Sequence, residues 1–257
     1  MAADTPSQTV IIHGAGGAAG GAVAEEFARR GAELFLAGHH LDAVNATADR
    51  GRFLGAGDVE AAEVDASDPA AVDAHAAAVV DTAGRIDVVL NATGLPAVQG
   101  VPLLKMSADD VAAPAAAWLR TQFITSRAAA VHMAARGSGT ILLLSASPAR
   151  VSIAGVGGFA AACSAVEALT RTFAAELGRS GVRAVCLRPQ RIVETIGSTP
   201  DLPMSLDEFT GFLEALTTTG TLPTLDEVAK AAVFLAEGGA ASMNGAVLNL
   251  TCGMSSD

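Results

Sequence analysis

A cluster of glycines near the start of the chain has the composition of a phosphate-binding loop. The sequence HGAGGAAG, residues 13 to 20, lies between an apolar run at 9–14 and a helical pattern at 18–30. Its glycines are Gly14, Gly16, Gly17 and Gly20. Glycines let the backbone turn sharply and approach a pyrophosphate, and the free N–H groups and dipole of a helix start favour its negative charge. The loop therefore predicts a dinucleotide-binding site.

Short apolar runs alternate with longer helical patterns from one end of the chain to the other. The predicted strands cover 9–14, 33–38, 60–65, 86–93, 140–147, 182–189 and 246–253. The predicted helices cover 18–30, 41–50, 69–83, 107–136, 158–179, 206–216 and 225–237. Strands that are apolar throughout are typical of a parallel sheet covered on both faces. The pattern predicts an α/β, Rossmann-type doubly wound fold with a seven-stranded, mostly parallel sheet, built as one domain over 1–257.

The least regular stretch covers residues 190–226. It is rich in Thr, Gly and Pro around one short amphipathic helix, and it separates the sixth strand from the last helix. A connection of this length is more often a lid over a site than an ordinary loop, so we expect a substrate lid here, with a plain surface excursion as the alternative.

Composition limits the class of partner. The formal net charge of −11 argues against nucleic acid and against an anionic membrane surface, because both reward Lys and Arg. A small-molecule ligand or another protein is favoured. The cysteines, Cys163, Cys186 and Cys252, have neither paired nor metal-ligand spacing, so we expect reduced thiols and no metal site. With neither a leader-like start nor a long apolar run, the sequence predicts a cytoplasmic protein.

Four further motifs resemble those of the short-chain dehydrogenase/reductase family, and the resemblance covers nearly the whole chain. They are NATG at 91–94, EVDASD at 63–68, VLNLTCGM at 247–254 and the helical SAVEALTRTFAAEL at 164–177. The family binds a nicotinamide dinucleotide. The resemblance implies that Asp65 contacts the adenine and that Asn91 and Gly94 belong to the cofactor site.

The glycine loop departs slightly from the usual pattern of that family. Against Thr-Gly-x-x-x-Gly-x-Gly, His13 stands at the Thr position and Ala18 at the middle Gly. Read as Gly-x-x-Gly-x-x-Gly, the loop matches the extended and atypical branches instead. A dinucleotide fits either reading, and a loop that keeps its shape without a ligand is the alternative.

The residues after the second strand bear on the choice between NADP and NAD. Gly38 lies where an acidic residue would bind the ribose 2′-OH, and His39 lies where NADP-using members carry Arg. The missing carboxylate removes a repulsion from a 2′-phosphate, so NADP is favoured and NAD remains open. His39 and His40 carry little charge at pH 7, and simple solvent exposure is the alternative for both.

The stretch RPQRIVET, 188 to 195, resembles the family's Pro-Gly-x-x-x-Thr segment, which contacts the nicotinamide carboxamide. Pro189 and Thr195 are kept, whereas Gln190 replaces the glycine. The resemblance thus implies that the adenosine half of the cofactor site is better preserved than its reactive half.

The resemblance breaks down at the family's catalytic residues. In the family a Tyr protonates the substrate carbonyl, a Lys four residues later lowers the pKa of that Tyr, a Ser holds the oxygen and an Asn supports a proton relay. The residues at the Asn, Ser, Tyr and Lys positions are Trp118, Ala146, Phe159 and Cys163, and the chain contains no tyrosine. Since positioned acid–base catalysis is worth about 10²- to 10⁴-fold, ordinary carbonyl reduction should be severely impaired.

A few polar residues near these positions are candidates for other chemistry. Ser145 and Ser147 are placed to bind an oxygen, Arg150 to hold an anion, and Cys163 to act as a nucleophile if its pKa were lowered. Simpler roles compete: strand-end capping for the serines, surface exposure for Arg150 and space filling for Cys163. Lys105 is out of register with the family's Lys and is expected to be exposed.

Three functions therefore remain open. The first is a divergent oxidoreductase that uses NADP(H), and the second is a catalytically silent nucleotide- or metabolite-binding partner of an active dehydrogenase. The third is a non-redox enzyme, such as a cyclase, dehydratase or isomerase, that reuses the pocket. We also expect a homodimer or homotetramer through the Ala-rich helices 107–136 and 158–179, or a hetero-oligomer with an active relative.

Overall fold

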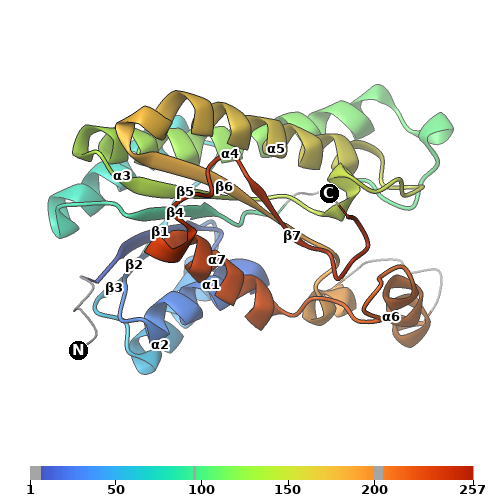
Figure 1. Ribbon diagram of the computed structural model, residues 1–257, viewed down its shortest axis with the longest axis horizontal. Helices are drawn as coiled ribbons and strands as arrows, with labels where there is room; N and C mark the ends of the chain where they lie inside the picture. Colours follow the sequence, from blue (N-terminus) through green and yellow to red (C-terminus); the bar gives the residue numbers. More distant parts are fainter. Residues whose placement is uncertain (1–6, 95–96, 199–204, 257) are drawn as a thin grey trace.

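The computed structural model describes residues 7–94, 97–198 and 205–256, and it contains one seven-stranded sheet. The strands are β1 (Thr9–His13), β2 (Glu33–Gly38), β3 (Val59–Glu63), β4 (Val88–Asn91), β5 (Gly139–Leu144), β6 (Val182–Pro189) and β7 (Val247–Leu250). They run in the order β3-β2-β1-β4-β5-β6-β7, and every neighbouring pair is parallel. The predicted doubly wound α/β fold is confirmed (Figure 1).

Helices cover both faces of the sheet. The α-helices are α1 (Ala18–Arg29), α2 (Leu41–Leu54), α3 (Pro69–Ala83), α4 (Ala108–Arg136), α5 (Gly157–Leu177), α6 (Leu206–Ala215) and α7 (Leu225–Ala236). Short 3-10 helices are η1 (Leu103–Lys105), η2 (Ser147–Ala149), η3 (Gly178–Ser180), η4 (Val193–Ser198) and η5 (Gly238–Ala240). Figure 1 shows α3, α4 and α5 on one face and α1, α2 and α7 on the other, with α6 to one side.

The two-sided cover explains why the strands are apolar without alternation. In β1, Ile11 belongs to the apolar cluster under α3, α4 and α5, whereas Val10 and Ile12 belong to the cluster on the opposite face. Each of the three side chains is at most 1% exposed. If polar and apolar residues alternated along the strand, the polar side chains would lie in one of these two cores. The strands therefore have apolar residues on both faces.

Most predicted boundaries agree with the structure to within about three residues, but α2 continues to Leu54, four residues beyond its predicted end. The helix passes through Gly51, which is buried. A Cβ added to this residue would lie 3.3 Å from the side chain of Leu34. It ends at Gly55, whose φ of +101° is a left-handed conformation that favours glycine. Gly51 is therefore a point of close packing inside α2 and not its end.

The segment predicted as a lid, 190–226, contains η4 and α6, and its residues 199–204 lie outside the described residues. Ile196 of η4, Leu213 of α6 and Leu222 form a small apolar cluster of their own, apart from the two cores of the sheet. In the described ranges, no helix has the length and apolar character needed to cross a membrane.

The strand order places a switch point between β1 and β4. From β1 the chain winds outward to β2 and β3 and then crosses back to β4, on the other side of β1. The carboxyl ends of these two strands, His13 and Asn91, are paired in register. Ligands of doubly wound sheets bind outside the carboxyl ends of the strands at such a point, so the site is sought here.

Candidate functional site

The glycine loop is held in its shape by contacts that leave no room for larger residues. Gly14 adopts φ +79°, and a Cβ on it would lie 2.7 Å from the backbone of Ala92, after β4. A Cβ on Gly20 would overlap the carbonyl oxygen of Gly14, because α1 begins directly against the loop. These two glycines shape the loop rather than face a ligand.

Gly16 and Gly17, in contrast, are exposed and line an open cleft of about 430 Å³ at the start of α1. Gly17 is the N-cap of that helix and offers no side chain to its first N–H groups, and the first turn carries no acidic residue. Such a helix start favours an anion. The loop therefore fits the pyrophosphate of a dinucleotide, although the exposed methyl of Ala18 narrows the approach.

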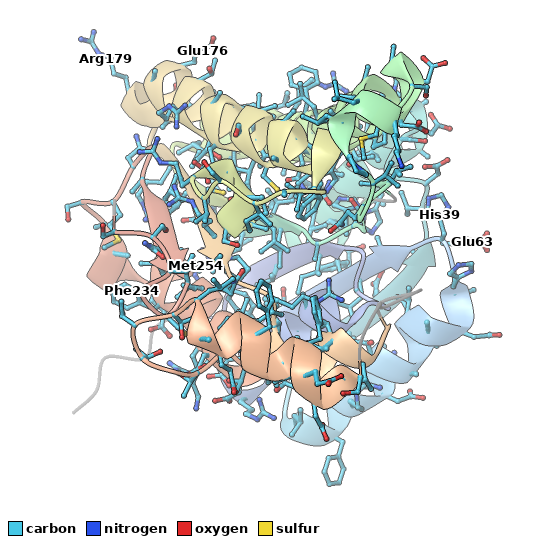
Figure 2. The ribbon with its side chains drawn as sticks, turned by 90° about the vertical axis from the view of Figure 1, so that its right-hand side faces the viewer. His39, Glu63, Glu176, Arg179, Phe234 and Met254 are labelled. Atoms are coloured by element: carbon cyan, nitrogen blue, oxygen red, sulfur yellow. The ribbon has the colours of Figure 1, made fainter. Side chains whose placement is uncertain are left out.

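The two residues predicted at the adenosine end lie in contact with each other. His39, just beyond β2, places its Nε2 3.3 Å from Oδ1 of Asp65, which follows β3. The backbone N–H of Ser67 donates to the same carboxylate oxygen at 2.7 Å, and hydrogen bonds from Ser67 are the main reason that the pKa of Asp65 is lowered. Both side chains are accessible to a ligand, and Figure 2 shows His39 at the surface.

Asn91 organises the turn after β4. It is buried, its Nδ2 donates to Thr125 Oγ1 at 2.9 Å, and its Oδ1 accepts from the backbone N–H and the hydroxyl of Thr93. Gly94, at the end of the turn, is exposed. The amide thus fixes the backbone at Thr93, just after β4, and its Oδ1 already accepts two hydrogen bonds from that residue.

Two of the four residues at the predicted catalytic positions form an aromatic stack. The rings of Trp118, from α4, and Phe159, from the first turn of α5, lie 6.2 Å apart at an angle of 19°. The indole N–H of Trp118 donates to the carbonyl oxygen of Thr93 at 3.2 Å. Gly158 allows the close approach of the two helices, since a Cβ there would overlap the Val111 carbonyl. An apolar surface therefore lies where the resemblance places an acid.

The other two, Cys163 and Ala146, are also neighbours. Cys163 is 0% exposed, and burial raises the pKa of its thiol to about 12, partly offset by a hydrogen bond with the backbone of Ala146. Burial likewise raises the pKa of Cys186 to about 12. A thiol with such a pKa is protonated at neutral pH and is a poor nucleophile. Cys163 fills space in the core and does not offer a thiolate.

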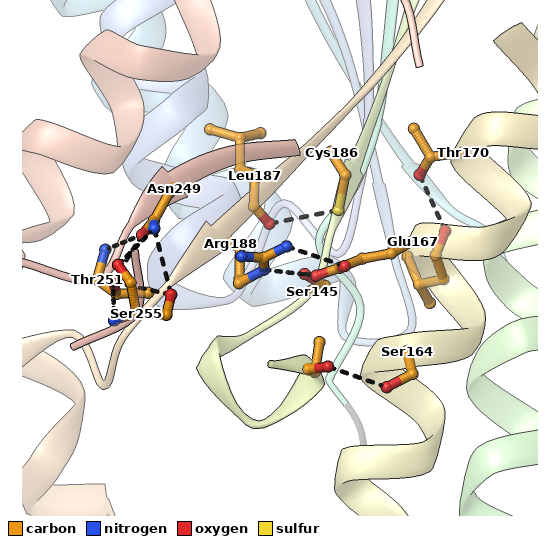
Figure 3. A network of polar contacts seen from close by, with 12 residues as sticks. Ser145, Ser164, Glu167, Thr170, Cys186, Leu187, Arg188, Asn249, Thr251 and Ser255 are labelled. Atoms are coloured by element: carbon orange, nitrogen blue, oxygen red, sulfur yellow. Dashed lines mark hydrogen bonds and ion pairs between the residues drawn. The ribbon is translucent and has the colours of Figure 1, made fainter. Parts of the chain in front are cut away.

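Ser145 is committed to a buried charge network (Figure 3). Its Oγ donates to Oε1 of Glu167 at 3.0 Å, and the Arg188 guanidinium donates to both oxygens of that carboxylate at 2.6 and 3.0 Å. The three residues come from the end of β5, from α5 and from β6, and none is more than 4% exposed. The network ties together the elements that carry the predicted catalytic positions.

Ser147 is committed as well. Its Oγ donates to Oε1 of Gln190 at 2.5 Å, and the amide nitrogen of Gln190 contacts the sulfur of Met254. Gln190 thus fills the place where the family has a glycine and joins the end of β6 to the C-terminal segment. Its neighbour Pro189 is buried, as the last residue of β6.

Arg150 lines a second open cleft, of about 620 Å³. The walls are the turn after β5 and the residues after β7, namely Pro148, Ala149, Arg150, Val151, Ser152, Gly253, Met254, Ser255 and Ser256. Figure 2 shows His39 and Met254 on different sides of the molecule, so this cleft and the adenosine end are separate regions.

Thr195 lies in η4, after β6. Its Oγ1 donates at 2.8 Å to the carbonyl oxygen of Ile192, the residue before η4. Counted from Pro189, the spacing Pro-Gly-x-x-x-Thr falls on Glu194, and it is Glu194 that lines the cleft with Gly16 and Gly17. Lys105 is exposed in η1 as expected, and the described residues contain no group of three or more His, Cys, Asp or Glu able to hold a metal ion.

Comparison with known proteins identifies the family. A family model described as Enoyl-(Acyl carrier protein) reductase matches residues 14–255. D-threitol dehydrogenase of Mycolicibacterium smegmatis is 30% identical over 247 residues, which are 94% of this chain and 90% of that protein. The chain belongs to the short-chain dehydrogenase/reductase family, which is a family of oxidoreductases.

Solved structures agree with this membership of the short-chain dehydrogenase/reductase family. A gluconate 5-dehydrogenase from Burkholderia cenocepacia, in complex with NADP and tartrate, superposes with a TM-score of 0.85 at 27% identity, covering 96% of this chain and 94% of that one. An NAD⁺-bound xylitol dehydrogenase gives a TM-score of 0.86 at 19% identity, covering 95% and 97%, and so shows the fold alone.

Three residues that matter in this short-chain dehydrogenase/reductase were not singled out in the sequence, namely Glu167, Arg188 and Glu194. Glu167 carried a weak signal, because it is the one charged residue in the otherwise uncharged helical stretch GFAAACSAVEALT. Arg188 lies near the end of the apolar strand β6, and an arginine buried there needs an oppositely charged partner. Strict counting of the Pro-Gly-x-x-x-Thr spacing would have found Glu194.

Proposed function

We propose that this chain is an NADP(H)-binding member of the short-chain dehydrogenase/reductase family in which tyrosine-dependent carbonyl reduction is severely impaired. The observation that carries the proposal is the stack of Phe159 on Trp118 beside a fully buried, protonated Cys163. In this interpretation Trp118, Ala146, Phe159 and Cys163 are the degenerate remnants of the Asn, Ser, Tyr and Lys positions. None of the four side chains donates a proton at neutral pH to a developing alkoxide.

The residues that would hold the nucleotide come from the segments that follow β1, β3 and β4. Gly16, Gly17 and the N–H groups of the α1 start would hold the pyrophosphate, and Asp65 would hold the adenine. Asn91 and Gly94 shape the turn beside them. When bound, the nicotinamide supplies a hydride to an electrophilic carbon.

The preference for NADP over NAD rests on the end of β2. Gly38 presents no carboxylate to a 2′-phosphate, and His39 is exposed nearby. Nε2 of His39 lies 3.3 Å from Oδ1 of Asp65, so the contact between these two exposed side chains is the part of the site that a 2′-phosphate would meet.

Two steps test the proposal. The protein is first titrated with NADPH and NADH while nucleotide fluorescence is followed. It is then mixed with NADPH and a panel of ketones, enones and quinones. We expect binding, with carbonyl reduction at least about 10²-fold below that of an active relative. Absence of binding up to about millimolar nucleotide, or turnover at the rate of an active relative, would contradict the proposal.

A second candidate function, a catalytically silent partner of an active dehydrogenase, is favoured by the outer face of α4. Phe123 is 45% exposed and Val131 is 61% exposed, two helical turns apart on the same face. Such residues suit an interface through α4 and α5, in a homo-oligomer or with a cytoplasmic relative. Size measurement of the purified protein, alone and with an active relative, separates the cases, and a monomer in both would remove this candidate.

A further inference from the structure

We propose that Glu194 lowers the affinity of this protein for nucleotide, because its carboxylate repels the pyrophosphate in the glycine-loop cleft. The inference rests on the proposed function, because it assumes that a nucleotide is the ligand of that cleft. The inference goes beyond the proposed function because it names the residue that limits the affinity. It also states that the cleft disfavours negative charge on the part of the ligand next to that residue.

The backbone holds Glu194 in place. Its two carboxylate oxygens accept the N–H of Leu225, the first residue of α7, at 3.0 and 3.2 Å. The cleft is lined by Glu194 and by Gly16, Gly17 and Ala18 at the start of α1. The starts of α1 and α7 therefore meet at one cleft, and a carboxylate of the chain itself already occupies the N-terminal end of α7.

The remaining charges of the cleft are paired with one another or with nearby groups. Arg50 contacts Glu25 at 2.5 Å, and Arg29 lies 3.9 Å from the same carboxylate. Asp226 lies 2.7 Å from Lys230. Glu194, in contrast, forms no ion pair within the described part of the chain, and its hydrogen-bond donor is a backbone amide. It carries the uncompensated charge of this wall.

A pyrophosphate at the start of α1 would enter the field of this carboxylate. Two like charges about 6 Å apart repel each other, and at an effective dielectric constant of about 40 this repulsion lowers the affinity for the ligand by a factor on the order of ten. The start of α1 attracts the same pyrophosphate, so the net affinity reflects the attraction by the helix start minus the repulsion by Glu194. Removing the negative charge at Glu194 leaves the attraction by the helix start in place.

The test compares Glu194→Gln with the wild type. Glutamine is of the same size and keeps a carbonyl oxygen for the Leu225 N–H. The matched control is Glu227→Gln, which removes a carboxylate at the same start of α7, where it caps Thr224 without lining the cleft. Binding of NADPH is followed by fluorescence, and binding of ADP, which carries the pyrophosphate without nicotinamide, by calorimetry.

We expect the dissociation constants of both ligands to fall about tenfold in E194Q and by less than about twofold in E227Q. The ratio between wild type and E194Q should shrink as salt rises from about 0.05 to about 0.5 M, because salt screens an exposed charge. Equal or weaker binding by E194Q would overturn this inference while the proposed function stands. Absence of binding by wild type and E194Q alike would overturn both.

Discussion

The two ends of the site differ in what they are made of. At the glycine-loop end, residues 13–20 offer backbone N–H groups and a helix start, and Gly14 and Gly20 are required by the space around them. At the proposed reaction-centre end, formed by Trp118, Ala146, Phe159 and Cys163, the resemblance assigns each function to a particular side-chain atom, and none of these four residues carries it. The glycine-loop end keeps its backbone features, and the four residues of the proposed reaction centre lack the reactive groups.

The difference has a physical basis. A pyrophosphate subsite needs only a turn conformation and free N–H groups, which a loop keeps as long as its glycines fit. Proton transfer needs a group of suitable pKa within hydrogen-bonding distance of the substrate. Cys163, a buried thiol whose pKa is about 12, packs in the core but does not meet this requirement for proton transfer. The same fold can therefore remain stable without this chemistry.

The largest expected effect tests what stabilises the reaction-centre end. Arg188→Met leaves the Glu167 carboxylate buried without its partner, which should lower the free energy of unfolding by about 3–5 kcal/mol. Urea denaturation measures it. Arg127→Met, which breaks the half-exposed pair with Asp73, is the control and should cost less than about 1 kcal/mol. Equal losses in the two variants would mean that the network is no more important than a surface pair.

The next largest effect restores the missing groups. The triple variant A146S/F159Y/C163K should reduce carbonyl substrates at least about 10²-fold faster than the wild type, because an acid and its supporting charge return. NADPH oxidation measures the gain, and thermal melting shows whether the variant folds with a lysine at a site that is 0% exposed in the wild type. A folded, nucleotide-binding triple variant without a gain would show that these positions are not the old catalytic ones.

A smaller effect tests the glycine-loop end. Gly14→Ala places a Cβ 2.7 Å from the Ala92 backbone at φ +79° and should lower the free energy of unfolding by about 2–3 kcal/mol and weaken nucleotide binding. Gly31→Ala is matched in φ, at +73°, and has no described atom within 4 Å of the added Cβ. It should cost about 1 kcal/mol and leave binding unchanged. Similar behaviour of the two variants would show that the close approach at Gly14 does not matter.

The smallest effect concerns the start of the loop. Burial, helped by the charge of His75 when protonated, lowers the pKa of His13 to about 3. The unfolded chain binds this proton near pH 6.5 and the folded chain does not, so the stability is fully present above about 6.5 and falls as pH decreases toward 3, by up to about 1.4 kcal/mol per pH unit. Denaturation at pH 7, 6 and 5 should show a shallower loss in His13→Thr. The exposed His40→Gln variant should match the wild type, and identical slopes in all three would contradict the assignment.

The sequence alone was sufficient for the fold and for the position of the loop. Runs such as TVIIHG have no polar alternation, and this is possible only where helices cover both faces, as α4 and α1 do. Gly14 and Gly20 could be placed because their role is local, within a few residues of chain. The assignment of Phe159 and Cys163 to replaced catalytic positions rests on the motif around them in the same helix, and it stays a prediction.

Only the tertiary structure decided what the remaining side chains do. Ser145 and Ser147 were equally plausible as oxygen ligands until their hydroxyls were found on Glu167 and Gln190, residues 22 and 43 positions away in the chain. Glu194 acquires its place only because α7 begins against the start of α1. Strand and helix patterns follow from the period of neighbouring residues, whereas the partner and the electrostatic environment of a polar group depend on which distant segments fold against it.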